Sequence, residues 1–197
     1  MKNSNNTQDI ILASKSPRRH QLLKDAGFSF TVIPSRINER LVQRSTPENH
    51  VRILAESKAK DVAKDYPNNW VIGADTVVLI GDTILGKPKS KSHARDMLSQ
   101  LSGNKHTVFT GFCICCKREK REITKTIHTE VFFKNLTIQE IEWYIRTKEP
   151  FDKAGGYAIQ GIGAFMIKKI KGSYTNVMGL PLCEVVEHLT DVGVTIK

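Results

Sequence analysis

The stretch 12–19, Leu-Ala-Ser-Lys-Ser-Pro-Arg-Arg, gathers residue types that suit an anion-binding site. The apolar run 10–13 is typical of a short buried strand, and Pro17 is typical of the first residue of a helix. A strand that passes directly into a helix leaves free backbone N–H groups at the positive end of the helix dipole. Ser14 and Ser16 add hydroxyl donors at this junction. The junction is therefore predicted to bind an anion such as a phosphate group.

Arg18 and Arg19 follow at the start of the expected helix. Their planar guanidinium groups match the geometry of phosphate oxygens. Because neighbouring helix residues point about 100° apart, the two side chains cannot reach one phosphate through the same face. One arginine is expected to serve the phosphate chain, and the other a sugar, a base or a neighbouring carboxylate. The alternative is a solvated first turn, although cations suit the positive end of a helix poorly.

Asp75 lies inside the strongly apolar stretch 70–80. A carboxylate is costly to bury unless it is paired with a cation or bound to a metal. A carboxylate on a strand that faces a cleft is a natural general base or metal ligand. The alternative is a buried charge that only caps a neighbouring loop.

Two lysines occupy positions that are unusual for a solvent-exposed side chain. Lys58 falls among the apolar positions of an expected helix, and Lys87 occupies a turn between Gly86 and Pro88. Each alone is more often a surface side chain whose aliphatic stem covers apolar groups. Together with the two arginines they make four cations, which matches the roughly three to four negative charges of a nucleoside triphosphate.

Periodicity and turn signals predict a mixture of helices and strands along the chain. Strands are expected at 10–13, 28–33, 70–80, 106–116 and 122–133, glycine-rich strands within 155–170, and helices at 17–26, from a Thr46 cap onward, at 92–101, 137–147 and 181–191. This mixture indicates an α/β protein with a mixed central sheet and helices on both sides. No repeat or linker marks a boundary, so a single domain over 1–197 is expected, with 1–8 poorly structured.

The composition narrows the class of partner. The chain of 197 residues carries a formal net charge of +10, which favours nucleic acid, a membrane surface or a phosphorylated ligand. No apolar run approaches the roughly 18 to 20 residues of a membrane span, and the polar N-terminus lacks a signal-peptide core. A cytoplasmic protein without a membrane partner is therefore expected. Nucleic acid is a less favoured partner because only 7% of the residues are aromatic and no stacking platform is visible. The Walker pattern GxxxxGK[ST] is missing, which excludes kinases and GTPases of that type.

Two further stretches carry no catalytic chemistry. The cysteines in 113–116 lack the second ligand pair that zinc sites need, so they are interpreted as small apolar residues of a strand. The basic stretch 117–125 is interpreted as a solvated hairpin tip, with a weak nucleic-acid surface as the alternative.

In order and spacing, a series of motifs resembles the Maf-like proteins, which are nucleotide pyrophosphatases. The motifs are Leu-Ala-Ser-Lys-Ser-Pro-Arg-Arg at 12–19, Gly-Ala-Asp-Thr-Val-Val at 73–78, Leu-Gly-Lys-Pro at 85–88, Leu-Ser-Gly at 101–103, Thr-Gly at 110–111, Asp-Lys-Ala-Gly at 152–155, Ile-Gln-Gly at 159–161 and Asn-Val-Met-Gly-Leu-Pro at 176–181. The resemblance covers about residues 10 to 190, nearly the whole chain.

The resemblance implies two lobes around a nucleotide cleft, with a fold like that of the inosine triphosphate pyrophosphatases. It implies hydrolysis of a nucleoside triphosphate between its α and β phosphates, with a divalent cation, Mg²⁺ or Mn²⁺. By match of motif, the phosphates would be held by Arg19, Lys58 and Lys87. Asp75 would activate water, and Glu39 would help Asp75 to bind the metal. A homodimer is common in the family.

Arg18, Thr76 and Gln160 are similar to the subtype that acts on dTTP and UTP rather than 7-methyl-GTP. The amide oxygen of Gln160 can accept from the N3–H of uracil or thymine while its NH₂ group donates to O4. The same amide can flip to suit cytosine. Two alternatives stay open: the 7-methyl-GTP subtype, and a nucleotide-binding regulator of septum formation in cell division.

Overall fold

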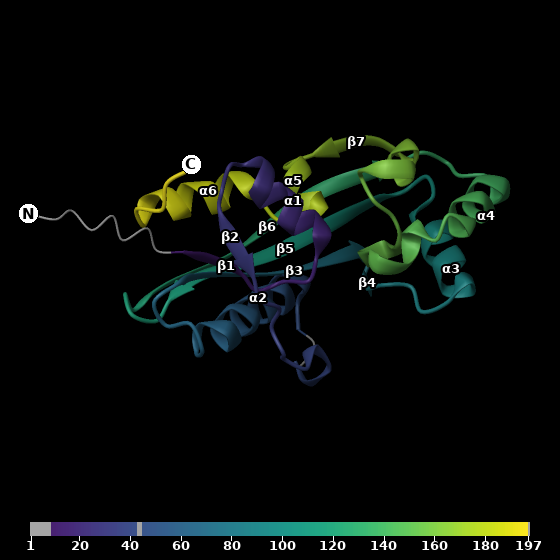
Figure 1. Ribbon diagram of the computed structural model, residues 1–197. Helices are drawn as coiled ribbons and strands as arrows, with labels where there is room; N and C mark the ends of the chain where they lie inside the picture. Colours follow the sequence, from purple (N-terminus) through teal and green to yellow (C-terminus); the bar gives the residue numbers. More distant parts are fainter. Residues whose placement is uncertain (1–8, 43–44, 197) are drawn as a thin grey trace, which may run out of the picture.

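The computed structural model describes residues 9–42 and 45–196, which build one mixed sheet of seven strands (Figure 1). The strands are β1 (Ile10–Leu12), β2 (Phe30–Val32), β3 (Trp70–Ile80), β4 (Thr83–Leu85), β5 (Lys105–Cys116), β6 (Arg121–Phe133) and β7 (Ile167–Lys171). Their order is β2-β1-β3-β5-β6-β7, and β4 pairs with β3. β1 is parallel to both neighbours, whereas the other pairs are antiparallel. The expectation for 1–8 lies outside the described residues.

Helices cover both faces of this sheet, as predicted. The α-helices are α1 (Pro17–Asp25), α2 (Pro47–Ala63), α3 (Lys91–Leu101), α4 (Ile138–Arg146), α5 (Tyr174–Met178) and α6 (Leu182–Asp191). In Figure 1, α1, α5 and α6 lie over one face and α2 over the other, while α3 and α4 lie beyond the far ends of the long strands. Within 9–42 and 45–196, no helix has both the length and the apolar character that a membrane crossing requires.

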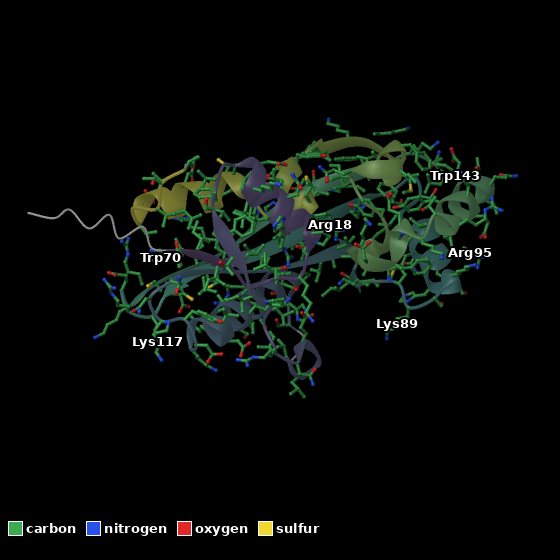
Figure 2. All side chains as sticks on the ribbon, viewed as in Figure 1. Arg18, Trp70, Lys89, Arg95, Lys117 and Trp143 are labelled. Atoms are coloured by element: carbon green, nitrogen blue, oxygen red, sulfur yellow. The ribbon has the colours of Figure 1, made fainter. Side chains whose placement is uncertain are left out.

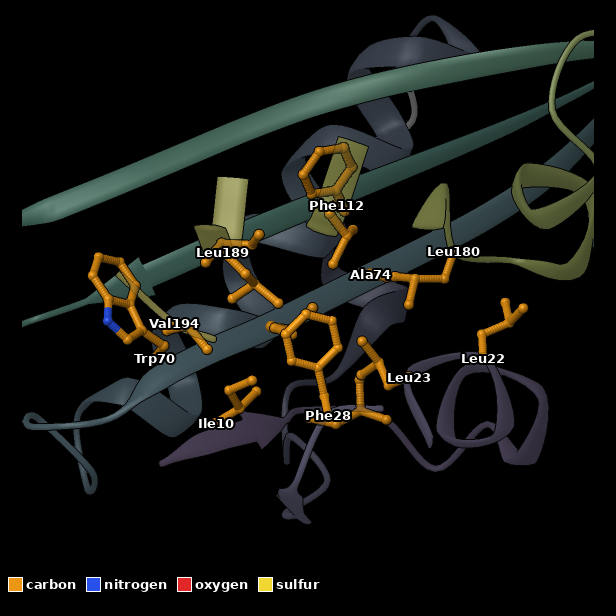
Figure 3. Packing of buried hydrophobic residues seen from close by; sticks show 14 of the residues in the cluster. Ile10, Leu22, Leu23, Phe28, Trp70, Ala74, Phe112, Leu180, Leu189 and Val194 are labelled. Carbon is orange, nitrogen blue, oxygen red and sulfur yellow. The ribbon is translucent and has the colours of Figure 1, made fainter. Parts of the chain in front are cut away.

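The two largest hydrophobic clusters lie toward opposite ends of the long strands, in agreement with the expected two-lobed organisation. The first cluster packs α1 and α6 against β1, β3 and β5, with Leu23, Phe112 and Leu189 among its buried members (Figure 3). The second cluster packs α3 and α4 against the other ends of β3, β5 and β6, around the fully buried Tyr144 and Leu98. The long antiparallel strands run through both clusters and connect the two lobes.

The helix starts that the sequence predicts are confirmed by their caps. The Ser16 hydroxyl accepts a hydrogen bond from the backbone N–H of Arg19 at the start of α1. The Thr46 hydroxyl caps α2 in the same way, and Thr137 forms a reciprocal capping box with Glu140 at the start of α4. Each cap satisfies backbone donors that a helix start would otherwise leave free.

Two glycines bring α2 into direct contact with the sheet. A Cβ atom at Gly73 on β3 would lie 2.3 Å from the carbonyl oxygen of Ala55, and one at Gly111 on β5 would lie 2.4 Å from that of Val51. Any side chain at these positions would therefore push the helix away. The close approach fixes where the side chains of α2 meet β3, and among them is Lys58.

The prediction of glycine-rich strands within 155–170 is wrong for most of that stretch. Three short 3₁₀ helices, Glu149–Asp152, Ala154–Gly156 and Gly161–Met166, precede β7. Gly155, Gly156 and Gly161 have φ angles of 70°, 71° and 74°, which lie in the left-handed region. A strand cannot continue through residues with such φ angles. The apolar residues between these glycines therefore belong to turns that pack against the second cluster. The turn-rich stretch 172–181 likewise contains the short helix α5.

Candidate active site

The guanidinium group of Arg19 is buried and donates four hydrogen bonds to protein groups. Its Nε donates to the carbonyl oxygen of Gly179 at 2.6 Å, and one terminal nitrogen donates to Ser14 Oγ at 3.1 Å and to the carbonyl oxygen of Ala74 at 2.9 Å. The other terminal nitrogen donates to Thr76 Oγ1 at 3.0 Å. Burial lowers the pKa of Arg19, and the charge of Asp75 opposes this effect. Arg19 thus joins the predicted anion site to β3.

Thr76 continues this network toward the C-terminal segments. Its hydroxyl lies 3.0 Å from that of Thr110, whose own hydroxyl donates to the carbonyl oxygen of Asn176. Asn176 is fully buried, and its amide nitrogen donates to Val108 O and Thr129 Oγ1. Thr110 and Asn176 occur in the family motifs, but no role was predicted for either residue from the sequence.

Arg18 points away from this network and pairs with a carboxylate. One of its terminal nitrogens lies 2.9 Å from Oδ2 of Asp152. Partial burial works to raise the pKa of Asp152, but hydrogen bonds from Lys153 and Arg18 bring it below its usual value. The two adjacent arginines therefore have different partners, as the 100° rotation between helix neighbours predicts, and Arg18 has the neighbouring carboxylate.

Lys58 brings two carboxylates together. Its ammonium group lies 2.7 Å from Oδ1 of Asp75 and 2.7 Å from Oε1 of Glu39. The side chains of Lys58 and Asp75 are only 11% and 13% exposed, whereas that of Glu39 is 55% exposed. Partial burial works to raise the pKa of Glu39, but the hydrogen bond from Lys58 and the positive charges of Lys58, Lys87 and Arg19 bring it below its ordinary value. Glu39 is therefore held ionised beside Asp75.

The donor set at Lys58 fits a divalent cation that also binds substrate. Mg²⁺ is usually held by one or two carboxylates together with substrate phosphates and water. Asp75 and Glu39 supply two carboxylates that both contact the Lys58 ammonium group and so lie close to each other. Over the described parts of the chain, no three His, Cys, Asp or Glu side chains form a group that could hold a metal ion. The residues thus fit a metal that is completed by substrate rather than a closed protein site.

Lys87 borders this site, and Gln160 follows the glycine-rich turns that are tied to the Lys87 segment. Lys87 is exposed on the segment after β4, and its charge acts on Glu39. The carbonyl oxygen of Gly86 accepts a hydrogen bond from the Gly155 N–H at 3.0 Å, which ties this segment to the glycine-rich turns. Gln160 is exposed at the start of the last 3₁₀ helix, and its side chain forms no hydrogen bond with another described residue. The structure therefore brings Ser14, Arg19 and Thr76 into one network and places Lys58, Asp75 and Glu39 in a second one.

Glu149 is a residue of this region that the sequence analysis missed. Its carboxylate accepts hydrogen bonds from Tyr144 Oη at 3.0 Å and from the backbone N–H groups of Ile162 and Gly163 at 3.2 and 2.9 Å. A Cβ atom at Gly161 would meet the same carboxylate at 2.9 Å. Glu149 thus fixes the turn that carries Gln160. The glycines on both sides of Ile162 were the available signal, because they admit a close neighbour.

A family model described as Maf-like protein matches residues 9–192. The chain belongs to this family. A dTTP/UTP pyrophosphatase of Syntrophus aciditrophicus (strain SB) is 51% identical over 187 residues, which cover 95% of this chain and 91% of the relative. A dTTP/UTP pyrophosphatase of Geotalea uraniireducens (strain Rf4) is 51% identical over 185 residues, covering 94% and 95%. Among solved structures, the Staphylococcus aureus Ham1 protein matches with a TM-score of 0.46 and 15% identity, over 81% of this chain and 80% of that one.

Proposed function

We propose that this protein hydrolyses dTTP and UTP between the α and β phosphates, releasing the nucleoside monophosphate and pyrophosphate. The observation that carries the proposal is the contact of Lys58 with both Asp75 and Glu39, beside the buried cation Arg19. Relatives that share half of the residues over nearly the whole chain are named dTTP/UTP pyrophosphatase. The proposal includes a cytoplasmic location, Mg²⁺ or Mn²⁺ as the cofactor, and association into a homodimer.

The cations of the site would receive the triphosphate. Lys58 and Lys87 would contact phosphate oxygens directly, since the Lys58 ammonium has a third N–H donor beside its contacts with Asp75 and Glu39, and Lys87 is exposed. Arg19 uses four of its five N–H donors on protein acceptors, so it would act on the phosphates through its charge, through its remaining N–H and by holding Ser14 and Thr76 in place. Ser16 caps α1 with its hydroxyl, and the free N–H groups of that helix start would lie near the same phosphates.

Asp75 would accept a proton from the attacking water. Lys58 engages Oδ1 of Asp75, and Oδ2 has no donor among the described residues, so one carboxylate oxygen is left for the proton. The charge that builds on the pyrophosphate leaving group would be balanced by Lys58 and Lys87. Glu39 and Asp75 would hold the divalent cation, which supplies Lewis-acid stabilisation of phosphate charge when bound.

The pyrimidine base would be selected by groups at the border of the site. The Gln160 amide offers one acceptor and two donors, which match N3–H and O4 of thymine and uracil. Arg18 is the chain neighbour of Arg19. On substrate binding it would exchange its ion pair with Asp152 for a contact with the nucleotide. Thr76 would contribute to substrate binding indirectly, because its hydroxyl accepts a hydrogen bond from Arg19 and holds that side chain in place.

The experiment that tests the proposal is a measurement of pyrophosphate release from dTTP, UTP, CTP, GTP and 7-methyl-GTP, each with Mg²⁺ and with EDTA. Metal-dependent release from dTTP and UTP above the others is expected. Release from 7-methyl-GTP instead would keep the reaction and overturn the choice of base. Folded protein that releases pyrophosphate from none of the nucleotides would overturn the catalytic proposal in favour of a nucleotide-binding regulator.

A further inference from the structure

A cavity lies between the C-terminal end of α2 and the β5–β6 hairpin. It has a volume of about 460 Å³. Its lining consists of Lys60, Ala63, Lys64, Cys115, Cys116, Lys117, Lys120, Arg121 and Glu122. Cys115 lies four residues beyond Gly111, the partner of Asp75 in the sheet, which corresponds to roughly 13 Å along a strand. Figure 2 shows Lys117 at the opposite end of the molecule from Lys89 and Arg95. The cavity is therefore separate from the candidate active site.

The lining of this cavity is strongly cationic. Five of its nine residues are lysine or arginine, and one is a carboxylate. That carboxylate, Glu122, lies 3.0 Å from Lys60 Nζ, and Lys60 also contacts Glu56. Hydrogen bonds from Lys60 to Glu56 and Glu122 raise its pKa, so Lys60 stays charged.

The other four cations lie outside these ion pairs. Within the described part of the chain, no carboxylate forms an ion pair with Lys64, Lys117, Lys120 or Arg121. Converging like charges repel one another and create a positive potential in a concave surface. An anion in the cavity would relieve this repulsion.

The cavity is held in shape by contacts around the hairpin. The N–H of Arg118 donates to the carbonyl oxygen of Pro67 at 2.8 Å, and Cys116 Sγ lies 3.6 Å from the same oxygen. Lys120 has a φ angle of 51°, in the left-handed region that non-glycine residues rarely adopt. The predicted hairpin tip is therefore fastened to the loop before β3. A cavity held in this way is formed before any ligand arrives.

The floor of the cavity is apolar. Ala63, Cys115 and Cys116 are at most 5% exposed and offer methyl, methylene and thiol groups. None of the nine lining residues is aromatic, so the bases of a nucleic acid would find no ring to stack on. The volume lies within the roughly 300–1,000 Å³ of small-molecule sites. These properties favour a compact ligand with an apolar body and an anionic group.

We propose that this cavity binds a small organic phosphate. Its phosphate group would contact Lys64, Lys117 and Arg121, and its apolar body would rest on the cysteine and alanine floor. Binding here does not depend on hydrolysis at Asp75, so this site and the proposed function can fail separately. α2 would then supply a cation to each of two phosphate sites, Lys58 within the helix and Lys64 at its C-terminal cap.

The test is amide NMR of the full chain titrated with phenyl phosphate as the probe. Saturable shifts are expected at the amides of 60–64 and 115–122, with tighter binding than that of inorganic phosphate. Mapping the shifts separates this site from binding at 14–19 and 75–76. Shifts confined to the latter residues, shifts that do not saturate, or equal affinity for inorganic phosphate would overturn the proposal.

A matched pair of variants sharpens this test. The variant Lys64→Gln/Lys117→Gln/Arg121→Gln is expected to weaken binding of phenyl phosphate in the cavity at least tenfold. The control variant Lys91→Gln/Arg146→Gln/Lys168→Gln removes three exposed charges from α3, α4 and β7 and is expected to change it less than twofold. Equal weakening by both triple variants would overturn the proposal.

Two further measurements address binding of nucleic acid and the folding of the variant. A 20-nucleotide single-stranded DNA that saturates the cavity amides at lower concentration than phenyl phosphate would overturn the proposal in favour of nucleic acid. If the triple cavity variant does not fold, the titration map of the unmodified chain and the single variant Lys117→Gln decide the question.

Discussion

The ammonium group of Lys58 lies 2.7 Å from Oδ1 of Asp75, across the contact between α2 and β3. The pair explains how a carboxylate can stand in the middle of an apolar strand, since a buried charge needs a partner. Because the contact uses only one oxygen of Asp75, the pairing is compatible with the proposed role as a base. The side chain of Asp75 thus has a structural partner and a free proton acceptor together.

Replacement of Asp75 by asparagine is expected to reduce turnover of dTTP by roughly two to four orders of magnitude, because general bases contribute about that much. Asparagine keeps the size of the side chain and an acceptor for Lys58 but cannot take a proton from water. The rate of pyrophosphate release checks this. Asp82→Asn, in the exposed turn between β3 and β4, is the control and should retain full activity. Near-normal turnover in Asp75→Asn would remove Asp75 from the role of base.

Replacement of Gly73 by alanine is expected to lower the free energy of unfolding by about 1–3 kcal/mol, because the added methyl group would overlap the backbone of α2. The displaced helix should also carry Lys58 away from Asp75 and reduce pyrophosphate release. Gly86→Ala is the control for stability, since a Cβ atom there meets nothing within 4 Å. Chemical denaturation measures both variants. Equal stability of Gly73→Ala and Gly86→Ala would show that α2 can move away from the sheet without cost.

Replacement of Glu149 by glutamine is expected to destabilise the protein by about 1–3 kcal/mol, because the side chain accepts three hydrogen bonds, and the amide has only one oxygen to accept them. Loosening of this turn should also reduce the preference for dTTP over CTP, since Gln160 is carried by the same turn. Glu142→Gln, which removes an exposed ion pair with Arg95, should leave both quantities unchanged. If the Glu149→Gln variant is destabilised but keeps the same ratio of dTTP to CTP turnover, Glu149 contributes to stability and not to the choice of base.

The burial of His106 leads us to expect that the folded protein loses stability in mild acid. Burial lowers the pKa of His106 to about 4, and its Nε2 lies 2.6 Å from the Tyr157 hydroxyl. Between its ordinary pKa of 6.5 and about 4, the unfolded chain binds a proton that the folded chain does not. The free energy of unfolding should therefore fall as the pH is lowered through this window, by up to about 3 kcal/mol.

Denaturation curves at several pH values between 4 and 7 measure this dependence. His106→Gln should lose most of it, whereas the exposed His20→Gln should keep it. If His106→Gln retains the same fall in stability as the unmodified chain, another group is responsible.

The helices and long strands were predictable because their signals are local. The Ser16, Thr46 and Thr137 caps and the apolar runs of β3 and β5 were each visible within a few residues. The 3₁₀ turns before β7 were not predictable in this way, because their apolar residues pack against the second cluster while left-handed glycines break any strand ladder.

In the candidate site, too, the residues were predictable and their long-range contacts were not. Residue types singled out Asp75, Lys58 and Arg19 one at a time. Their partners join residues far apart in the chain, as in the Arg19 contact with Gly179, and no spacing rule reports such contacts. The four protein acceptors of Arg19 could not be read from its motif, which by itself suggested a direct phosphate ligand.

These same contacts of Arg19 have a consequence for folding cooperativity. The guanidinium group loses its hydration only when the segments carrying Ser14, Ala74 and Gly179 have all assembled around it. A partly assembled state would leave a desolvated charge without its acceptors, which is strongly unfavourable. The start of α1, the middle of β3 and the end of α5 should therefore open and close as one unit. Slow exchange of their amides with solvent would then report a single shared opening free energy.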